Sequence, residues 1–236
     1  MSKGLTDRVL VAGRDAGMVA VGVTTAEPFV EARGALEQRK SDGLSASMQF
    51  TYRNPARSTD PGRILPGAQS LVVGAWPTAN REPSVATSAP NGAQNQGRVG
   101  RYVWRDHYAE LRAALEQIAD LLRNEGYQAR IAVDDNALVD RAAAHRAGLG
   151  WYGKNANVLV PGHGSWVVLG SVVTTAPLVA NDAPVADGCG TCNRCLDACP
   201  TQAIVAPGVV DARRCLAWLV QATGDFPEEH REALGD

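Results

Sequence analysis

Four cysteines and a proline lie within twelve residues near the C-terminal end, and this run restricts what that part of the chain can form. They share a short, regular spacing: Cys189, Cys192, Cys195, Cys199 and Pro200. Thiolates at this C-x2-C-x2-C-x3-C-P spacing bind the irons of a [4Fe–4S] cluster. Short CxxC steps let backbone amides point at the sulfides, and the proline ends the loop because it fixes φ. The run therefore predicts an iron–sulfur loop.

Zinc and disulfides are the competing interpretations of the same cysteines. Four thiolates also make a closed tetrahedral zinc site, but zinc ribbons usually split them into two CxxC pairs separated by a long insert. A disulfide framework needs an oxidising compartment, and the first residues do not have the pattern of a secretory signal. The spacing favours iron–sulfur over both.

The number of cysteines bears on the number of clusters. In two-cluster ferredoxins the fourth cysteine of such a run serves the other cluster, so the first three need a ligand from elsewhere. The remaining cysteine is Cys215, which gives five thiolates in all. Five thiolates cannot complete two four-cysteine clusters, so we expect one cluster, or a second whose missing ligands lie beyond this sequence.

Length and composition predict two domains. The chain has 236 residues, is 45% hydrophobic and keeps all five cysteines in its last fifth, which indicates a larger domain over 1–180 and a small cluster domain over 181–236. The net charge of −2 argues against a generally basic nucleic-acid binder, although a local patch stays possible. Without a long apolar run or a secretory start, we expect a soluble, cytoplasmic protein that does not enter a membrane.

Hydrophobic periodicity predicts an α/β (α+β) fold. Helices are expected over 5–17, capped by Thr6 or Asp7, from Pro28 to near Gly43, from about Tyr108 to Gly126, and over 137–147 and 211–221. Strands are expected over 18–24, 70–76, 128–133 and 201–205, and segments 155–161 and 166–175 are expected to form a hairpin. Loops are expected over 45–66 and 80–97, with a linker over 180–188.

Two segments carry candidate chemistry. Asp134, Asp135 and Asn136 follow a predicted strand, where they suit helix caps, the interpretation favoured by the residues alone, or a catalytic acid. Residues 148–155 are dense in glycine, which lets backbone approach a ligand, and contain Trp151 and Tyr152, which offer flat surfaces to a large ring.

Together these segments resemble the epoxyqueuosine reductases, cobalamin-dependent iron–sulfur enzymes of tRNA queuosine modification. The resemblance covers most of the chain from about Arg53. It rests on these motifs: Arg101-Tyr102, Val133-Asp134, Asp140-Arg141, 148–155, Gly164-Ser165-Trp166, Leu169-Gly170, the cysteine run continued to Ile204, and 211–215.

The resemblance implies a nitroreductase-like cobalamin-binding domain followed by a ferredoxin-like domain, and reduction of epoxyqueuosine in tRNA with cobalamin and one or two 4Fe–4S clusters. It implies that Asp134 is the proton donor. The residues matching cobalamin contacts are Arg57, Tyr102, Lys154, Asn155 and Ser165. The expected partners are tRNA, through its anticodon region, and an electron donor, with the protein acting as a monomer.

One departure from the family concerns its second cysteine run, which this sequence lacks. In the family that run completes the first cluster and shares the second with the residues matching Cys199 and Cys215, so we expect a truncated form or ligands from another chain. Two alternatives stay open: a ferredoxin-type electron-transfer module whose larger domain only docks, and a corrinoid-dependent reductase similar to the reductive dehalogenases.

Overall fold

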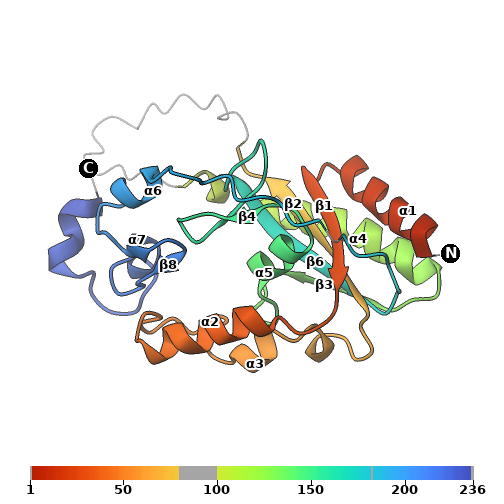
Figure 1. Cartoon of the computed structure of the whole chain (residues 1–236), viewed down its shortest axis with the longest axis horizontal. Helices are drawn as coiled ribbons and strands as arrows, with labels where there is room; N and C mark the ends of the chain where they lie inside the picture. Colours follow the sequence, from red (N-terminus) through yellow and green to blue (C-terminus); the bar gives the residue numbers. More distant parts are fainter. Residues whose placement is uncertain (1, 80–99, 182, 235–236) are drawn as a thin grey trace, which may run out of the picture.

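A four-stranded antiparallel sheet organises the larger part of the molecule (Figure 1). The computed structural model describes residues 2–79, 100–181 and 183–234; the loop expected over 80–97 lies outside them. The strand order is β1 (Ala20–Thr25), β2 (Ser70–Pro77), β6 (Val167–Thr174), β3 (Ala129–Val133), and each neighbouring pair is antiparallel. β2 and β6 are the inner strands, and because helices cover both faces of the sheet, their side chains are almost all buried.

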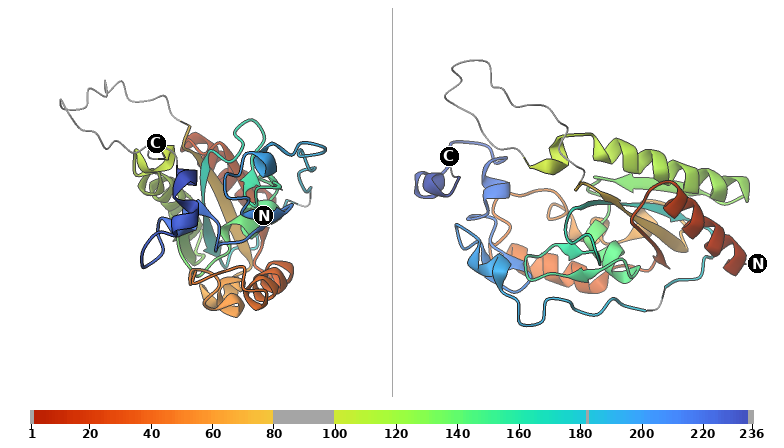
Figure 2. Two further views of the ribbon diagram at one scale, coloured as in Figure 1. Left: turned by 90° about the vertical axis from the view of Figure 1, so that its left-hand side faces the viewer. Right: turned by 90° about the horizontal axis from the view of Figure 1, so that it is seen from above.

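Helices cover both faces of this sheet. The first core lies beneath α1 (Ser2–Asp15) and α4 (His107–Asn124), which lie side by side in Figures 1 and 2. The apolar stripe of α4 is completely buried against the sheet: Leu111, Leu115, Ile118 and Leu122. The second core lies beneath α5 (Asp140–Arg146) and includes Phe29, just before α2 (Val30–Ser41). The sheet thus contributes side chains to two hydrophobic cores, one on each of its faces.

The packing of α5 onto the sheet depends on a glycine. A Cβ on Gly22 of β1 would lie 2.2 Å from the carbonyl oxygen of Ala147 and 2.8 Å from Leu149 Cδ1. Only a residue without a side chain lets the end of α5 come this close to the strand.

The cysteine-containing part of the chain lies at one end of the sheet (Figure 1). It contains α6 (Arg194–Asp197), the hairpin of β7 (Ile204–Ala206) and β8 (Val209–Val210), α7 (Leu216–Leu219) and the 3-10 helix η3 (Glu228–Leu234). Backbone contacts attach it to the larger part: Gly208 N–H donates to Lys154 O at 2.9 Å and Ala212 N–H to Leu44 O at 2.8 Å. Arg39 Nη2 also donates to Gly208 O at 2.9 Å.

The segment that follows β6 is fastened to the rest of the molecule as it runs towards the cysteines (Figure 2). Val179 N–H donates to Thr6 Oγ1 at 2.9 Å, and Asn181 N–H donates to Val23 O of β1 at 2.8 Å. The Asn181 side chain donates to Ala147 O at 3.2 Å. The linker expected over 180–188 contains no helix or strand in its described residues, 180–181 and 183–188, and its first part is bound to the edge of the sheet.

Most expected elements are confirmed, with α4, β2 and β3 close to their predicted limits. The caps proposed for the first helix are wrong, because α1 begins at Ser2 and places Thr6 and Asp7 inside it. Loop 45–66 contains two one-turn helices, α3 (Pro55–Ser58) and η1 (Pro61–Arg63), each with a proline in its first turn and an Asn or Asp side chain as its cap. Another 3-10 turn, η2 (Arg101–Val103), precedes α4.

Two further predictions are wrong. Segments 155–161 and 166–175 do not form a two-stranded hairpin: β5 (Val158–Leu159) pairs with β4 (Trp151–Tyr152), while β6 joins the central sheet, because burial of a long apolar strand outweighs a local turn. The helix expected over 211–221 is reduced to α7, and Cys215 is its N-cap residue. No helix in the described residues is long and apolar enough to cross a bilayer.

We predict opposite stability effects for two glycine substitutions. Gly22→Ala should lower the free energy of unfolding by roughly 1–3 kcal/mol, because the new methyl group overlaps the Ala147 carbonyl. Gly34→Ala in α2, where no atom lies within 4 Å of the added Cβ, should raise it by up to about 1 kcal/mol. Urea unfolding of both variants measures the difference, and a Gly22→Ala protein as stable as Gly34→Ala would contradict the packing described.

Candidate active site

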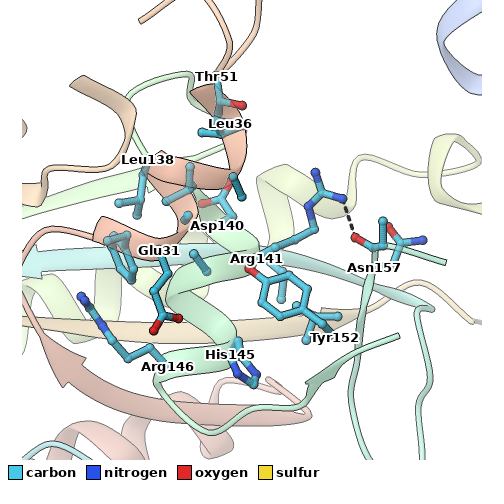
Figure 3. A pocket seen from close by; sticks show the side chains of 18 of the residues that line it. Glu31, Leu36, Thr51, Leu138, Asp140, Arg141, His145, Arg146, Tyr152 and Asn157 are labelled. Carbon is cyan, nitrogen blue, oxygen red and sulfur yellow. Dashed lines mark hydrogen bonds between the residues drawn. The ribbon is translucent and has the colours of Figure 1, made fainter. Parts of the chain in front are cut away.

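A cavity of about 1140 Å³ lies between α5, α2 and the short β4–β5 sheet. Ligand cavities commonly span about 300–1,000 Å³, so this one has room for a large ligand. Its walls carry apolar and aromatic side chains from separate elements: Phe29, Leu36, Tyr108, Leu138, Tyr152 and Val158. A few polar and charged side chains lie among them (Figure 3).

Helix α5 fixes one wall of the cavity through its polar side chains. His145 Nδ1 lies 3.1 Å from Gly150 O, and its ring packs on Tyr152 with centroids 5.0 Å apart. Arg141 Nη1 donates to Ala156 O at 2.7 Å. These contacts hold the β4–β5 segment against the helix.

Arg146 fixes the opposite side. Its guanidinium lies 3.6 Å from the centroid of the Phe29 ring and donates to Thr25 O at 2.7 Å and to Glu27 O at 2.9 Å. Burial lowers the pKa of Arg146, and the nearby Glu27 acts in the opposite direction. The arginine therefore ties the connection between β1 and α2 to α5, and the cavity lies between these elements.

Asp134 reaches the cavity from the end of β3 in a strained backbone conformation. Its φ of +51° lies in the left-handed region, which costs free energy for any residue with a side chain. The helix-cap interpretation is wrong for this residue: α5 begins six residues later, and it is Asp135 Oδ1 that accepts from Ala137 N–H, at 2.9 Å. No hydrogen bond within the described residues uses the Asp134 carboxylate, which is exposed and lines the cavity.

A second carboxyl group lines the same cavity. Burial, followed by the charge of Asp134, raises the pKa of Asp140 well above its ordinary value, while Arg141 lowers it. Asp140 Oδ1 is buried without a hydrogen-bond partner in the described structure. Burial, together with the charges of Asp134 and Asp140, raises the pKa of Tyr108 to about 12. Asp140 therefore stays protonated at pH values at which an ordinary aspartate is charged, and it does so near the exposed Asp134.

This burial predicts a pH-dependent effect of Asp140→Asn. Below the ordinary pKa of 3.8 both the folded and the unfolded chain hold the proton, and as pH rises the unfolded chain releases it first. Asp140 therefore costs increasing stability between that value and its raised pKa in the folded state. Because asparagine does not titrate, the melting temperature of Asp140→Asn relative to the unaltered protein should rise with pH.

Thermal unfolding of both proteins across the acidic to neutral range measures this difference. Asp15→Asn, at the exposed last residue of α1, is the control, because no ion pair of this carboxylate is found within the described residues, and it should leave the pH dependence nearly unchanged. A melting-temperature difference for Asp140→Asn that stays constant or falls as pH rises would contradict the burial of an uncharged Asp140.

The cysteine run forms a loop close to this cavity. All five cysteines are free thiols, and the turn begins with Cys189 N–H donating to Asp187 Oδ1 and Cys192 N–H donating to Cys189 O, both at 2.8 Å. Burial raises the pKa of Cys199, but hydrogen bonds from the backbone of Ala203 and Ile204 and from Thr201 outweigh it, and the pKa is lowered. A lowered pKa favours the thiolate, the form that binds iron.

Within the described residues, no three His, Cys, Asp or Glu side chains converge on the position of a single metal ion. An iron–sulfur cube is held differently, because each iron takes its own thiolate and the cysteines surround the cluster.

Segment 148–155 joins the cysteine loop to the cavity. Trp151 Nε1 lies 3.5 Å from Cys189 Sγ, and the next residue, Tyr152, lines the cavity. Lys154 Nζ donates to Gly190 O at 2.9 Å and to Asn193 Oδ1 at 2.8 Å. The two candidate sites are therefore in contact through one short strand and the turn that follows it.

The glycines of this segment serve the packing of the chain itself. A Cβ on Gly148 would lie 2.2 Å from Asn181 Nδ2, and one on Gly150 would lie 2.2 Å from Leu159 O. The expectation that these glycines open the backbone to a ligand is not supported by these contacts. They let neighbouring segments approach, and Tyr152 is the aromatic residue of the segment that lines the cavity.

The structure brings together only some of the residues matched to cobalamin contacts. Ser165 lines the cavity, as does the candidate acid Asp134. The other four do not line it: Arg57 on α3, Tyr102 on η2, Lys154 and Asn155. Lys154 binds the cysteine loop, and Asn155 Oδ1 accepts from Asn157 N–H at 3.1 Å. Sequence reasoning gave no role to Tyr108, Asp140 or His145, although Asp140 lay in a quoted motif and Tyr108 began an apolar helical stripe.

Known proteins resemble this chain along almost its whole length. The epoxyqueuosine reductase of Atelocyanobacterium thalassa is 35% identical over 232 residues, which cover 95% of this chain and 72% of that protein. The chain belongs to the epoxyqueuosine reductase family. The epoxyqueuosine reductase of Bacillus cereus is 33% identical over 98% of this chain, and the chain spans 60% of that relative's length. Residues 188–236 match the 4Fe-4S double cluster binding domain, so the cysteine-containing part is an iron–sulfur domain.

Solved structures agree with this family assignment. A selenomethionine-labelled epoxyqueuosine reductase superposes with a TM-score of 0.88 at 32% identity, covering 98% of this chain and 61% of that one. An epoxyqueuosine reductase bound to an epoxyqueuosine-modified tRNA-Tyr stem loop has a TM-score of 0.83 at 30% identity, with the same coverage. A catabolic reductive dehalogenase has a TM-score of 0.61 at 17% identity, covers 99% of this chain and 34% of its own, and shares the fold.

Proposed function

We propose that this chain removes the epoxide oxygen of epoxyqueuosine in tRNA, with cobalamin in the cavity and electrons from the iron–sulfur domain. The observation that carries the proposal is the contact between the two sites: Trp151 touches Cys189, while Tyr152 and the unpaired acid Asp134 line the cavity. The relatives' names and the tRNA stem loop bound to one of them support the substrate. We further propose a monomer that acts in the cytoplasm and receives its electrons from an external donor.

The cavity fits a corrinoid in size and in the chemistry of its walls. Its volume exceeds the usual range for small-molecule sites, and its lining combines apolar and aromatic side chains with scattered polar groups. Tyr152, Val158 and Ser165 would hold the ring, and Arg57, Tyr102, Lys154 and Asn155 stay proposed contacts. When bound and reduced, cobalamin supplies a nucleophilic electron pair.

Asp134 would supply the proton that the epoxide oxygen needs as the ring opens. General acid catalysis requires a carboxyl group within hydrogen-bond reach of that oxygen. Within the described residues the Asp134 carboxylate accepts no hydrogen bond, so it is available to a substrate. Deoxygenation of an epoxide to an alkene consumes two electrons and two protons and releases water. Asp140 and Tyr108 also line the cavity, their pKa values are raised in part by the charge of Asp134, and they can replace the proton that Asp134 gives up.

The cluster ligands we propose are the five cysteines: Cys189, Cys192, Cys195, Cys199 and Cys215. We keep the division of the chain into domains 1–180 and 181–236 as part of the proposal. Iron and sulfide analysis of anaerobically prepared protein counts the clusters: about four irons per chain means one cube, and about eight means two.

Cobalamin and tRNA binding distinguish the proposed function from its alternatives. The protein should change the absorption of added cobalamin under reducing conditions and convert epoxyqueuosine in a tRNA stem loop. An electron-transfer module would not bind cobalamin. A dehalogenase-like reductase would bind cobalamin but not the stem loop, and either result would overturn the proposal.

We predict that Asp134→Asn lowers the rate of epoxide conversion by roughly 10²- to 10⁴-fold, the usual contribution of a general acid. Cobalamin binding should be unchanged, because the substitution removes a proton and not volume. Asp135→Asn is the matched control, since an asparagine oxygen can still accept from Ala137 N–H. Full turnover by Asp134→Asn would remove its assignment as proton donor.

A further inference from the structure

The indole of Trp151, which lies outside the iron–sulfur domain, hydrogen-bonds a cysteine sulfur. Its N–H donates to Cys189 Sγ over 3.5 Å, a normal length for a bond to sulfur. Cys189 opens the run that resembles the ligand loop of a 4Fe–4S cluster and lies within the matched iron–sulfur domain. A donor from the cavity side of the molecule thus points at a sulfur of the cluster loop.

Packing holds the indole in this position. A Cβ on Gly188 would lie 2.6 Å from the indole Cζ2, so the ring rests on the backbone just before Cys189. The backbone that carries the indole is also fixed, because Trp151 pairs with Leu159 of β5 and His145 contacts the carbonyl of the preceding Gly150. Turning the indole away from Cys189 would give up its packing on Gly188.

The cysteine loop is also fixed on the same side. Lys154, three residues after Trp151, donates to Gly190 O and to Asn193 Oδ1. The loop is therefore held at Cys189 by the indole and one residue later by the ammonium group. Because both donors belong to one short segment, β4 and the turn that follows it, the N–H and the sulfur keep their relative position.

We propose that Trp151 is a positioning residue for the iron–sulfur cluster, and that its N–H bond to Cys189 raises the reduction potential of that cluster. Hydrogen bonds to the sulfurs are among the factors that set such potentials. A reduced cluster carries one more negative charge than an oxidised one, and a hydrogen bond to an anionic acceptor is stronger when the acceptor carries more charge. The bond thus stabilises the reduced form more than the oxidised form.

The proposal rests on Cys189 as a cluster ligand and on no property of cobalamin or tRNA. It gives the short strand β4 two roles, since Trp151 acts on the cluster while Tyr152 lines the cavity. A cluster that is easier to reduce accepts electrons more readily from the external donor, and β4 keeps its loop beside the wall of the cavity.

The test compares Trp151→Phe with the unaltered 236-residue chain after anaerobic cluster reconstitution. Phenylalanine keeps an aromatic ring on Gly188 and removes the N–H. We expect the one-electron reduction equilibrium to shift three- to tenfold towards the oxidised cluster, up to about 59 mV in midpoint potential. A potentiometric titration followed by electron paramagnetic resonance measures it without cobalamin or tRNA.

Trp76→Phe is the matched control, because Trp76 Nε1 donates to Glu110 Oε2 at 2.9 Å in the central part of the molecule. It loses the same kind of group and should leave the potential unchanged. Equal potentials for Trp151→Phe and Trp76→Phe, with intact clusters in both, would overturn the proposal.

Two further measurements decide the question if Trp151→Phe does not assemble a cluster. Gly188→Ala keeps the N–H but displaces the indole from Cys189, so it should shift the potential in the same direction. Deuterium exchange should shift the iron–sulfur vibrations seen by resonance Raman spectroscopy more in the unaltered protein than in Gly188→Ala, because backbone donors such as Ala203 N–H are present in both. No difference between the two proteins in either measurement would show that the indole N–H does not act on the cluster. Because neither involves epoxide turnover, loss of the proposed function would leave this inference untouched.

Discussion

The position of segment 148–155 depends on close packing of neighbouring segments that only glycine permits. Gly150 lies against the Leu159 carbonyl and Gly148 against the Asn181 side chain, both closer than any added methyl group allows. From this fixed segment Trp151 faces the cysteine loop and Tyr152 faces the cavity. If the segment moved, both sites would lose a wall at once, so packing of the chain against itself determines the distance between them.

The two carboxyl groups of the cavity differ because their surroundings differ. Asp134 is exposed on a strained turn, whereas Asp140 has a buried oxygen and a raised pKa. Proteins commonly separate the roles of paired acids in this way, by exposing one and burying the other. Here the difference follows from the positions of the two residues in the chain. Asp134 comes directly after β3, and Asp140 is the first residue of α5.

The sequence predicted the parts of the structure that local patterns specify. The stripe of α4, the buried strands β2 and β3 and the cysteine spacing all carry short-range signals, and the comparisons confirm the iron–sulfur domain. The partner of β6 could not be predicted, because pairing with β2 and β3 depends on which distant strands bury the same face. Asp134 seemed a cap because its neighbour Asp135 has the same chemistry, and only the backbone shows which of them turns inward. Lys154 was assigned to a cofactor because its motif suggested it, while its contact with the cysteine loop depends on tertiary structure.

Both outer strands of the central sheet have side chains or linker backbone bound to their free carbonyl groups. Beside β1, Asn181 of the linker donates to Val23 O, and beside β3, Arg112 and Arg123 donate to Val133 O and Ala129 O. An open strand edge is a template on which another chain can add a strand, and charged or covered edges prevent this. The linker that leads to the cysteines therefore also covers part of the β1 edge, where a strand of another chain could otherwise pair.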